Sequence, residues 1–170
     1  VLKAGRTEAG RKAVSSHTAS LAGNEEVNNA ALRQSGVIRA RDNEHLFGLL
    51  RAFSKQPLPR GNRVMVITYT GSLGVAAADT LALNHMQLAG LEPFLEKRLR
   101  NILPTYANIA NPVDCSFSMT PGQVQKLVEI GIESEDVHSF IVIIPGETLG
   151  AFVASLKDIP YKGKPIVCCV

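Results

Sequence analysis

The chain has 170 residues, of which 45% are hydrophobic and 19% are charged. This composition is typical of a soluble globular protein, and the length suits one domain or one domain with part of another. The net charge is +3, aromatic residues make up 5% and tryptophan is absent, which argues against an aromatic stacking surface for nucleic acid. The basic stretches 3–12 and 33–41 suit an anionic small molecule at least as well.

Cysteine usage and hydropathy bear on the compartment. The three cysteines, Cys115, Cys168 and Cys169, show no CxxC or Cys/His metal spacing, which predicts reduced thiols and no metal site. We recognise no signal peptide and no apolar run near the length of a membrane span, so we expect a cytoplasmic protein without a membrane partner. The chain begins at Val1 and ends in a strand-like run, which suggests a piece of a longer polypeptide.

The first region, residues 1–56, is predicted to be mostly helical. A strand end and a basic turn over 1–6 precede a short helix over 7–14, and small residues then form a loop over 15–23. Asn24 caps a second helix that ends before Gly36, and a short strand covers 37–38. A third helix starts at Asp42 or Asn43. Its apolar face has the spacing i, i+3, i+4, i+7: Leu46, Leu49, Leu50 and Phe53.

A linker over 57–62, with two prolines and a glycine, separates this region from residues 63–170. The second region alternates strands and helices. It predicts an α/β fold of the flavodoxin-like type, a parallel sheet with helices on both faces. Residues 120–123 predict a capped helix start. The expected strands are 64–68, 88–91, 140–144 and 166–170, and the expected helices include 75–84, 94–103 and 147–157.

His17 is the first candidate site residue, flanked by Ser16 and Thr18 in the small-residue loop. Imidazole is neutral and nucleophilic near pH 7, so it can accept and return a phosphoryl group. A polar loop residue without chemistry is the alternative, and it is favoured when His17 is considered alone.

The turn over 69–74 is the second candidate. It follows the first strand of the second region, at the sheet edge where ligands of open α/β folds bind. Gly71 and Gly74 allow backbone amides to approach an anion closely, and the next helix directs its positive end there. Thr68, Thr70 and Ser72 can add hydroxyl donors. A turn that only connects a strand to a helix is the alternative.

Asn111 and Asp114, in the stretch Asn111-Pro112-Val113-Asp114, are a third candidate. Pro112 restricts Asn111 to extended geometry, so both polar side chains are held at fixed positions. Local turn hydrogen bonds are the alternative, favoured without other information. The remaining histidines, His45, His85 and His138, have no neighbouring carboxylate–nucleophile arrangement in the sequence.

Together these segments resemble the NDP-forming acyl-CoA synthetases, the superfamily of ADP-forming acetyl-CoA synthetase and succinyl-CoA synthetase. The matching stretches are 1–10 leading into 16–23, 61–64 running to 71–79, and 111–114. The resemblance implies that His17 carries the phosphoryl group, with Gly71, Ser72 and Gly74 as its anion site. Ser16, Thr18, Asn111 and Asp114 have supporting roles. The chain departs from the family pattern at Ala19, Tyr69 and Ser72.

The resemblance also implies the reaction and its partners. Acyl-CoA, ADP and phosphate interconvert with a carboxylic acid, CoA and ATP. CoA, ATP or ADP and Mg²⁺ bind mainly outside this chain, on CoA-binding and ATP-grasp domains or subunits of an oligomer. Residues 1–56 are then the end of a phosphohistidine-bearing, succinyl-CoA synthetase-like domain, and 63–170 most of a second such domain. Two alternatives stay open: a regulatory module of a protein lysine acetyltransferase, and a non-catalytic domain that senses acyl-CoA or nucleotide.

Overall fold

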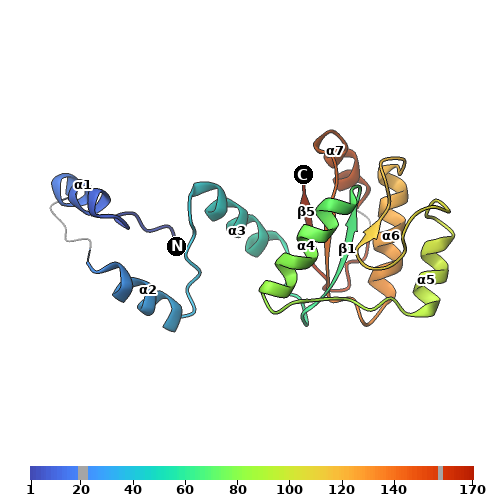
Figure 1. The fold of residues 1–170 in the computed structure, drawn as a ribbon, viewed down its shortest axis with the longest axis horizontal. Coiled ribbons are helices and arrows are strands. Elements are labelled where there is room, and N and C mark those ends of the chain that lie inside the picture. The colour runs from blue at the N-terminus through green and yellow to red at the C-terminus, as the bar shows by residue number, and fades with distance from the viewer. Residues whose placement is uncertain (19–22, 157–158) are drawn as a thin grey trace. The chain divides into compact units, whose positions relative to one another are not determined.

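A computed structural model describes residues 1–18, 23–156 and 159–170 of the chain. It divides into two compact units, Val1–Lys55 and Gln56–Val170 (Figure 1). We describe each unit by itself. Within the described residues, no helix has the length and apolar character needed to cross a membrane.

The first unit contains three helices, α1 (Glu8–Thr18), α2 (Glu25–Gln34) and α3 (Asn43–Lys55). The Asn24 side chain accepts hydrogen bonds from the amides of Glu26 and Val27, which confirms the predicted cap of α2. The prediction of a short strand at 37–38 is wrong. Leu2 and Ala40 instead form a single isolated parallel bridge. The segment before α3 thus pairs with the N-terminal segment at one position only, among the described residues, and this is too little to form a strand.

A polar network organises the start of α2. The Glu25 carboxylate accepts a hydrogen bond of 2.7 Å from Arg39 Nη1 and lies 3.6 Å from Arg6 Nε. Arg39 also donates to the Lys3 carbonyl at 3.2 Å. The hydrogen bond and charge of Arg39 hold the pKa of Glu25 below its usual value. Ion pairs therefore connect segments of this unit that lie far apart in the sequence.

The second unit is built on a parallel sheet, which confirms the predicted α/β fold. Its strands are β1 (Arg63–Thr68), β2 (Gln87–Leu88), β3 (Val113–Asp114), β4 (Ser139–Ile143) and β5 (Ile166–Cys169). The order is β2-β1-β4-β5, and β3 also pairs with β1. β2 pairs with the start of β1 and β3 with its end. All pairings are parallel, so the carboxyl ends of the strands share one edge of the sheet.

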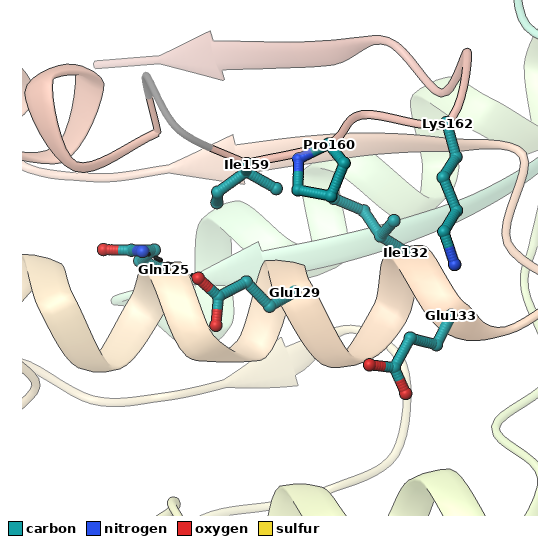
Figure 2. A pocket seen from close by; sticks show the side chains of 7 residues that line it. All are labelled: Gln125, Glu129, Ile132, Glu133, Ile159, Pro160 and Lys162. Carbon is teal, nitrogen blue, oxygen red and sulfur yellow. Dashed lines mark hydrogen bonds between the residues drawn. The ribbon is translucent and has the colours of Figure 1, made fainter.

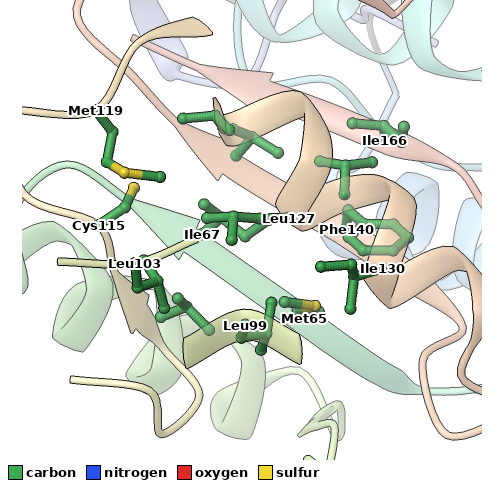
Figure 3. Packing of buried hydrophobic residues seen from close by; sticks show 14 of the residues in the cluster. Met65, Ile67, Leu99, Leu103, Cys115, Met119, Leu127, Ile130, Phe140 and Ile166 are labelled. Carbon is green, nitrogen blue, oxygen red and sulfur yellow. The ribbon is translucent and has the colours of Figure 1, made fainter. Parts of the chain in front are cut away.

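Helices cover both faces of this sheet. Val64 and Val66 of β1 pack with Leu81 of α4 (Gly71–Leu83) on one face. On the other face, Met65 and Ile67 join a large apolar core with α5 (Pro93–Arg100), α6 (Pro121–Glu133) and α7 (Gly146–Ser155) (Figure 3). β1 is buried on both sides, as the continuous apolar run predicted.

Element ends differ from the predictions by a few residues. The capping box of Thr120 and Gln123 at the start of α6 is confirmed. The strand expected over 88–91 is shorter and earlier, as β2, and the helix expected over 94–103 ends at Arg100 in α5. The helix expected over 147–157 is α7, which ends at Ser155. Lys157 lies outside the described residues.

Candidate functional site

His17 lies on the last turn of α1, with its side chain exposed. The prediction that it sits on a loop is wrong, because the helix continues past Val14 to Thr18. Ser16 fits this helix by donating its hydroxyl to the Ala13 carbonyl at 2.9 Å. Ala19 and the rest of the expected loop to Ala22 lie outside the described residues, and the Thr18 side chain is not described either.

This position has an electrostatic consequence. The C-terminal end of a helix carries partial negative charge, which favours a cationic imidazole and opposes a phosphoryl dianion. A phosphoryl group on His17 therefore needs positive groups from outside α1.

In the second unit, the start of α4 has the features of an anion site. The helix begins at Gly71, four residues earlier than predicted, so Gly71 and Ser72 lie in its first turn. The first amides of a helix have no carbonyl within the helix to which they can donate. The expectation for Gly74 needs correction, because its amide donates to the Thr70 carbonyl at 3.2 Å. A Cβ at Gly74 would lie 3.0 Å from Thr68 and 3.1 Å from Pro112, so this glycine permits close packing.

Threonine hydroxyls beside this helix start differ in availability. Thr68 is buried, and its hydroxyl both donates to the Thr70 carbonyl at 2.8 Å and accepts from the Thr70 amide at 3.1 Å. The Thr70 hydroxyl, in contrast, is buried without a hydrogen-bond partner among the described residues. It borders a mainly apolar hollow of about 210 Å³, whose lining includes Tyr69, Leu73, Phe117, Ile143 and Pro145. An unsatisfied donor thus lies beside the orphan amides.

Tyr69 has a structural role that the sequence did not indicate. Its hydroxyl donates to the Met119 carbonyl at 2.9 Å, and its ring packs at a tilt against Phe117. Burial raises the pKa of Tyr69 to about 12. The residue therefore anchors the loop after β3 to the end of β1 and stays protonated at neutral pH.

Asp114, the last residue of β3, lies against the start of α4. Its Oδ1 accepts from the Ser116 amide at 3.0 Å, and its Oδ2 would be 3.2 Å from a Cβ at Gly71. A carboxylate at this position stabilises the helix start in the way a bound anion would. The negative charge of Asp114 therefore opposes a second anion, such as a phosphate, at this helix start.

Asn111 bridges the edge of β1 between β2 and β3. Its Oδ1 accepts from the Val66 amide at 2.9 Å, and its Nδ2 donates to the carbonyls of Val64 and Ala89 at 2.8 and 3.0 Å. The side-chain amide thus replaces a strand where neither β2 nor β3 reaches. Both polar atoms of the carboxamide are used in these long-range bonds, so the alternative prediction, that Asn111 makes local turn bonds, is wrong.

The remaining candidates show no reactive arrangement. His45 accepts from the Arg41 amide at 3.2 Å, and His85 has a positive φ just after α4. Over residues 1–18, 23–156 and 159–170, no three His, Cys, Asp or Glu side chains gather as they would around a metal ion. Of the predicted site residues, the structure brings together Asp114 and Gly71, and it places Pro112 beside Gly74, all in the second unit. His17 belongs to the first unit.

A parallel sheet with helices on both faces, whose first strand runs into a helix start, defines an α/β domain of the doubly wound class. Residues 64–149, half of the chain, match the Ligase-CoA domain, and residues 1–53 match the Succinyl-CoA ligase like flavodoxin domain. The chain therefore belongs to the Ligase-CoA domain family, and the predicted resemblance is confirmed.

Relatives extend over the whole chain. Acetate–CoA ligase [ADP-forming] II of Archaeoglobus fulgidus is 35% identical over 100% of this chain and 26% of its own length. The alpha subunit of the corresponding Pyrococcus furiosus enzyme is also 35% identical, over 98% of this chain and 38% of that subunit. The chain thus spans about a quarter to two fifths of these relatives.

A solved structure gives the same result. The dinucleotide forming acetyl-coenzyme A synthetase 1 of Ca. Korarchaeum cryptofilum, in complex with phosphate and ADP, matches 99% of this chain and 38% of its own chain. The TM-score is 0.83 and the sequence identity is 30%.

Proposed function

We propose that this chain is part of an ADP-forming acyl-CoA ligase of the acetate–CoA ligase type. One observation carries the proposal: similarity to ADP-forming acetate–CoA ligases extends over the whole chain, through the His17 segment and the α4 start alike. The proposed reaction interconverts acyl-CoA, ADP and phosphate with a carboxylic acid, CoA and ATP.

The proposed chemistry has three transfers. A phosphate oxygen attacks the thioester carbon and the CoA thiolate leaves, giving an acyl phosphate. A nitrogen of His17 attacks phosphorus and the carboxylate leaves. A terminal phosphate oxygen of ADP then attacks phosphorus, and the imidazole leaves. Ser16 and Thr18 flank the nucleophile and have supporting roles.

In the proposal, the start of α4 stabilises the phosphorylated His17. The amides of Gly71 and Ser72 and the unpaired Thr70 hydroxyl are the donors, while Gly74 allows the helix to pack closely. They supply the positive end that α1 does not offer to a phosphoryl dianion. Asp114 tunes this site through its negative charge at the same helix start, and Asn111 holds the middle of β1 in place.

Partners follow from the same proposal. CoA and ATP or ADP with Mg²⁺ bind mainly outside this chain, on CoA-binding and ATP-grasp domains or subunits of an oligomer in the cytoplasm. Residues 1–56 form the end of the phosphohistidine domain, 57–62 a linker and 63–170 the second domain. We expect residues 1–170 alone to show no overall turnover, and a complete reaction by this chain alone would contradict that expectation.

Labelled phosphate tests the proposal on the full-length enzyme. Incubation with γ-labelled ATP should give an acid-labile, base-stable phosphoprotein, and His17→Asn should abolish the label. His45→Asn is the matched control, because His45 is another histidine of the first unit and should keep full labelling. A wild-type enzyme that takes up no label, or a His17→Asn enzyme that labels normally, overturns the proposal.

A further inference from the structure

Basic side chains gather at the sheet edge opposite the start of α4. Arg60 precedes β1, His138 precedes β4, and Lys162 and Lys164 precede β5. Because these three parallel strands are neighbours in the sheet, their amino ends meet at one edge. The four side chains line a cavity of about 460 Å³, which is in the size range of small-molecule sites.

The cavity has an excess of positive charge. Of its two carboxylates, Glu133 forms an ion pair with Arg98 and also interacts electrostatically with Lys162, so two carboxylates, one of them shared with Arg98, face three cations. Neither Arg60 nor Lys162 has an ion-pair partner among the described residues. Burial, together with the charges of Lys162 and Arg60, lowers the pKa of Lys164, while Glu135 opposes this shift. The cations are thus close enough to repel one another, and an anion between them would relieve that repulsion.

Two of the lining residues are held rigidly. Lys164 donates to the carbonyls of Ile132, at 2.8 Å, and of Ser134, at the end of α6. His138 Nδ1 accepts from the Arg63 amide at 3.1 Å, so the neutral ring carries its proton on Nε2 and keeps one donor. A Cβ at Gly61 would collide with this ring. The side chains of Lys164 and His138 are therefore held in place, whereas those of Arg60 and Lys162 form no ion pair within the described residues and can turn towards a ligand.

A second cavity lies along α6 (Figure 2). It has a volume of about 270 Å³ and shares Ile132, Glu133 and Lys162 with its neighbour. Ile159 and Pro160 give it an apolar wall. Gln125 and Glu129, which are joined by a hydrogen bond of 2.7 Å, offer polar atoms on the opposite side. This wall suits a flat, partly apolar group with exchangeable protons rather than a further phosphate.

We propose that these adjoining cavities bind a nucleoside diphosphate group. The diphosphate lies between Arg60 and Lys162, and the nucleoside extends over Ile132 towards Ile159 and Pro160, with Gln125 and Glu129 as hydrogen-bond partners. Free ADP and the diphosphate-bearing end of CoA share this chemistry. The site lies at the sheet edge opposite the α4 start, and it does not depend on the proposed ligase reaction.

Glycine amides of the 170-residue chain can report the binding in two-dimensional ¹H–¹⁵N NMR spectra. Gly61 and Gly163 flank the cationic cavity, whereas Gly71 and Gly74 mark the α4 start. Titration with ADP should move the Gly61 and Gly163 signals to saturation, whether or not Gly71 and Gly74 also respond. Unchanged or non-saturating signals at Gly61 and Gly163 overturn the proposal.

Parallel titrations at matched ionic strength identify the ligand. ADP or CoA should bind more tightly than inorganic phosphate, and the tighter of the two identifies the source of the nucleoside diphosphate. Phosphate binding as tightly as both would overturn the proposal for a nucleoside.

Charge variants test the residues. Arg60→Gln combined with Lys162→Gln should weaken ADP binding by about tenfold or more, because two charge-assisted contacts are lost. Lys126→Gln is the matched control, since it removes an exposed cation of α6 outside both cavities and should change affinity by less than about twofold. Unchanged affinity in the double variant, with a dispersed spectrum that shows a folded chain, contradicts the proposal.

Discussion

The two units of this chain are stabilised in different ways. The second unit buries apolar side chains from both faces of its sheet and from α4, α5, α6 and α7. In the first unit, neither α2 nor α3 has a buried residue, and the segments are joined by ion pairs centred on Glu25. A large apolar core contributes far more to stability than a few partly exposed ion pairs do, so the two units should differ strongly in their resistance to unfolding.

This difference shows what an amphipathic pattern can and cannot predict. The spacing of Leu46, Leu49, Leu50 and Phe53 correctly predicted α3. Leu50 and Phe53 remain exposed, at 54% and 57%, whereas Leu46 and Leu49 are partly buried. All four line a shallow hollow of about 240 Å³ with Val1, Val37 and Ile38. A helical period indicates which face is apolar, but it does not identify what covers that face.

Hydrogen exchange tests the comparison most directly and should show the largest effect. In the 170-residue chain, amides of β1 and β4 should exchange at least about a thousandfold more slowly than those of α2 and α3, because their opening requires unfolding of the core. Mass spectrometry of peptides from each unit measures both rates in one sample. Equal protection of α3 and β1 would show that the first unit is as stable as the second.

Removal of the Asn111 side chain should have the next largest effect. Asn111→Ala leaves the Val66 amide and the Ala89 carbonyl without partners, while the Val64 carbonyl keeps its bond from the Ala89 amide. The free energy of unfolding of the second unit should fall by about 3 kcal/mol. Chemical denaturation followed by circular dichroism measures this change.

Two asparagines serve as controls. Asn108→Ala removes an exposed side chain that accepts only from the Ala110 amide, so the effect should be well below 1 kcal/mol, on the order of surface changes. Asn24→Ala removes the α2 cap and should lower the stability of that helix by about 1 kcal/mol. Hydrogen exchange should therefore become faster in the first unit only. A similar loss for Asn111 and Asn108 would show that the bridge contributes little.

The elements that the sequence predicted well depend on local signals. The apolar run of β1 and the capping box of α6 are each contained in a few adjacent residues. Asn111 could be singled out as a candidate, but its partners on β1 lie 45 and 47 residues away. No local pattern contains such a contact.

The candidate site shows the same limit. Small polar residues around His17 predicted a loop, yet Ser16 bonds back to its own helix, and α1 continues. The glycines of the α4 start were recognised, whereas the packing role of Gly74 and the neighbouring Asp114 carboxylate depend on the return of the chain at β3. Residue types could be read from the sequence, but the environment that sets their charge and availability could not.

Disturbing the close packing between α6 and the sheet should lower the stability of the second unit by a smaller amount. A Cβ at Gly131 would lie 2.6 Å from Met65 Sδ and 2.7 Å from Phe140, both in the core of Figure 3. Gly131→Ala should destabilise the second unit by about 2 kcal/mol through overpacking. Gly122→Ala, on the same helix in open space, should be neutral or stabilise by up to about 1 kcal/mol. If both variants gave the same denaturation midpoint, α6 would not be packed tightly on β1.

Alkaline pH should lower the stability of the second unit, and this is the smallest of the expected effects. Cys115 is fully buried, its thiol donates to the Thr68 carbonyl, and burial raises its pKa from 9.0 to about 12. Above pH 9 the unfolded thiol loses its proton while the folded one keeps it. The stabilisation is therefore complete below pH 9 and declines as pH rises towards 12, by about 1.4 kcal/mol at pH 10. Cys115→Ser keeps a donor to Thr68 without titrating in this range, so its stability should fall less steeply with pH. Parallel profiles for both proteins would show that burial of Cys115 does not raise its pKa, and would contradict the prediction.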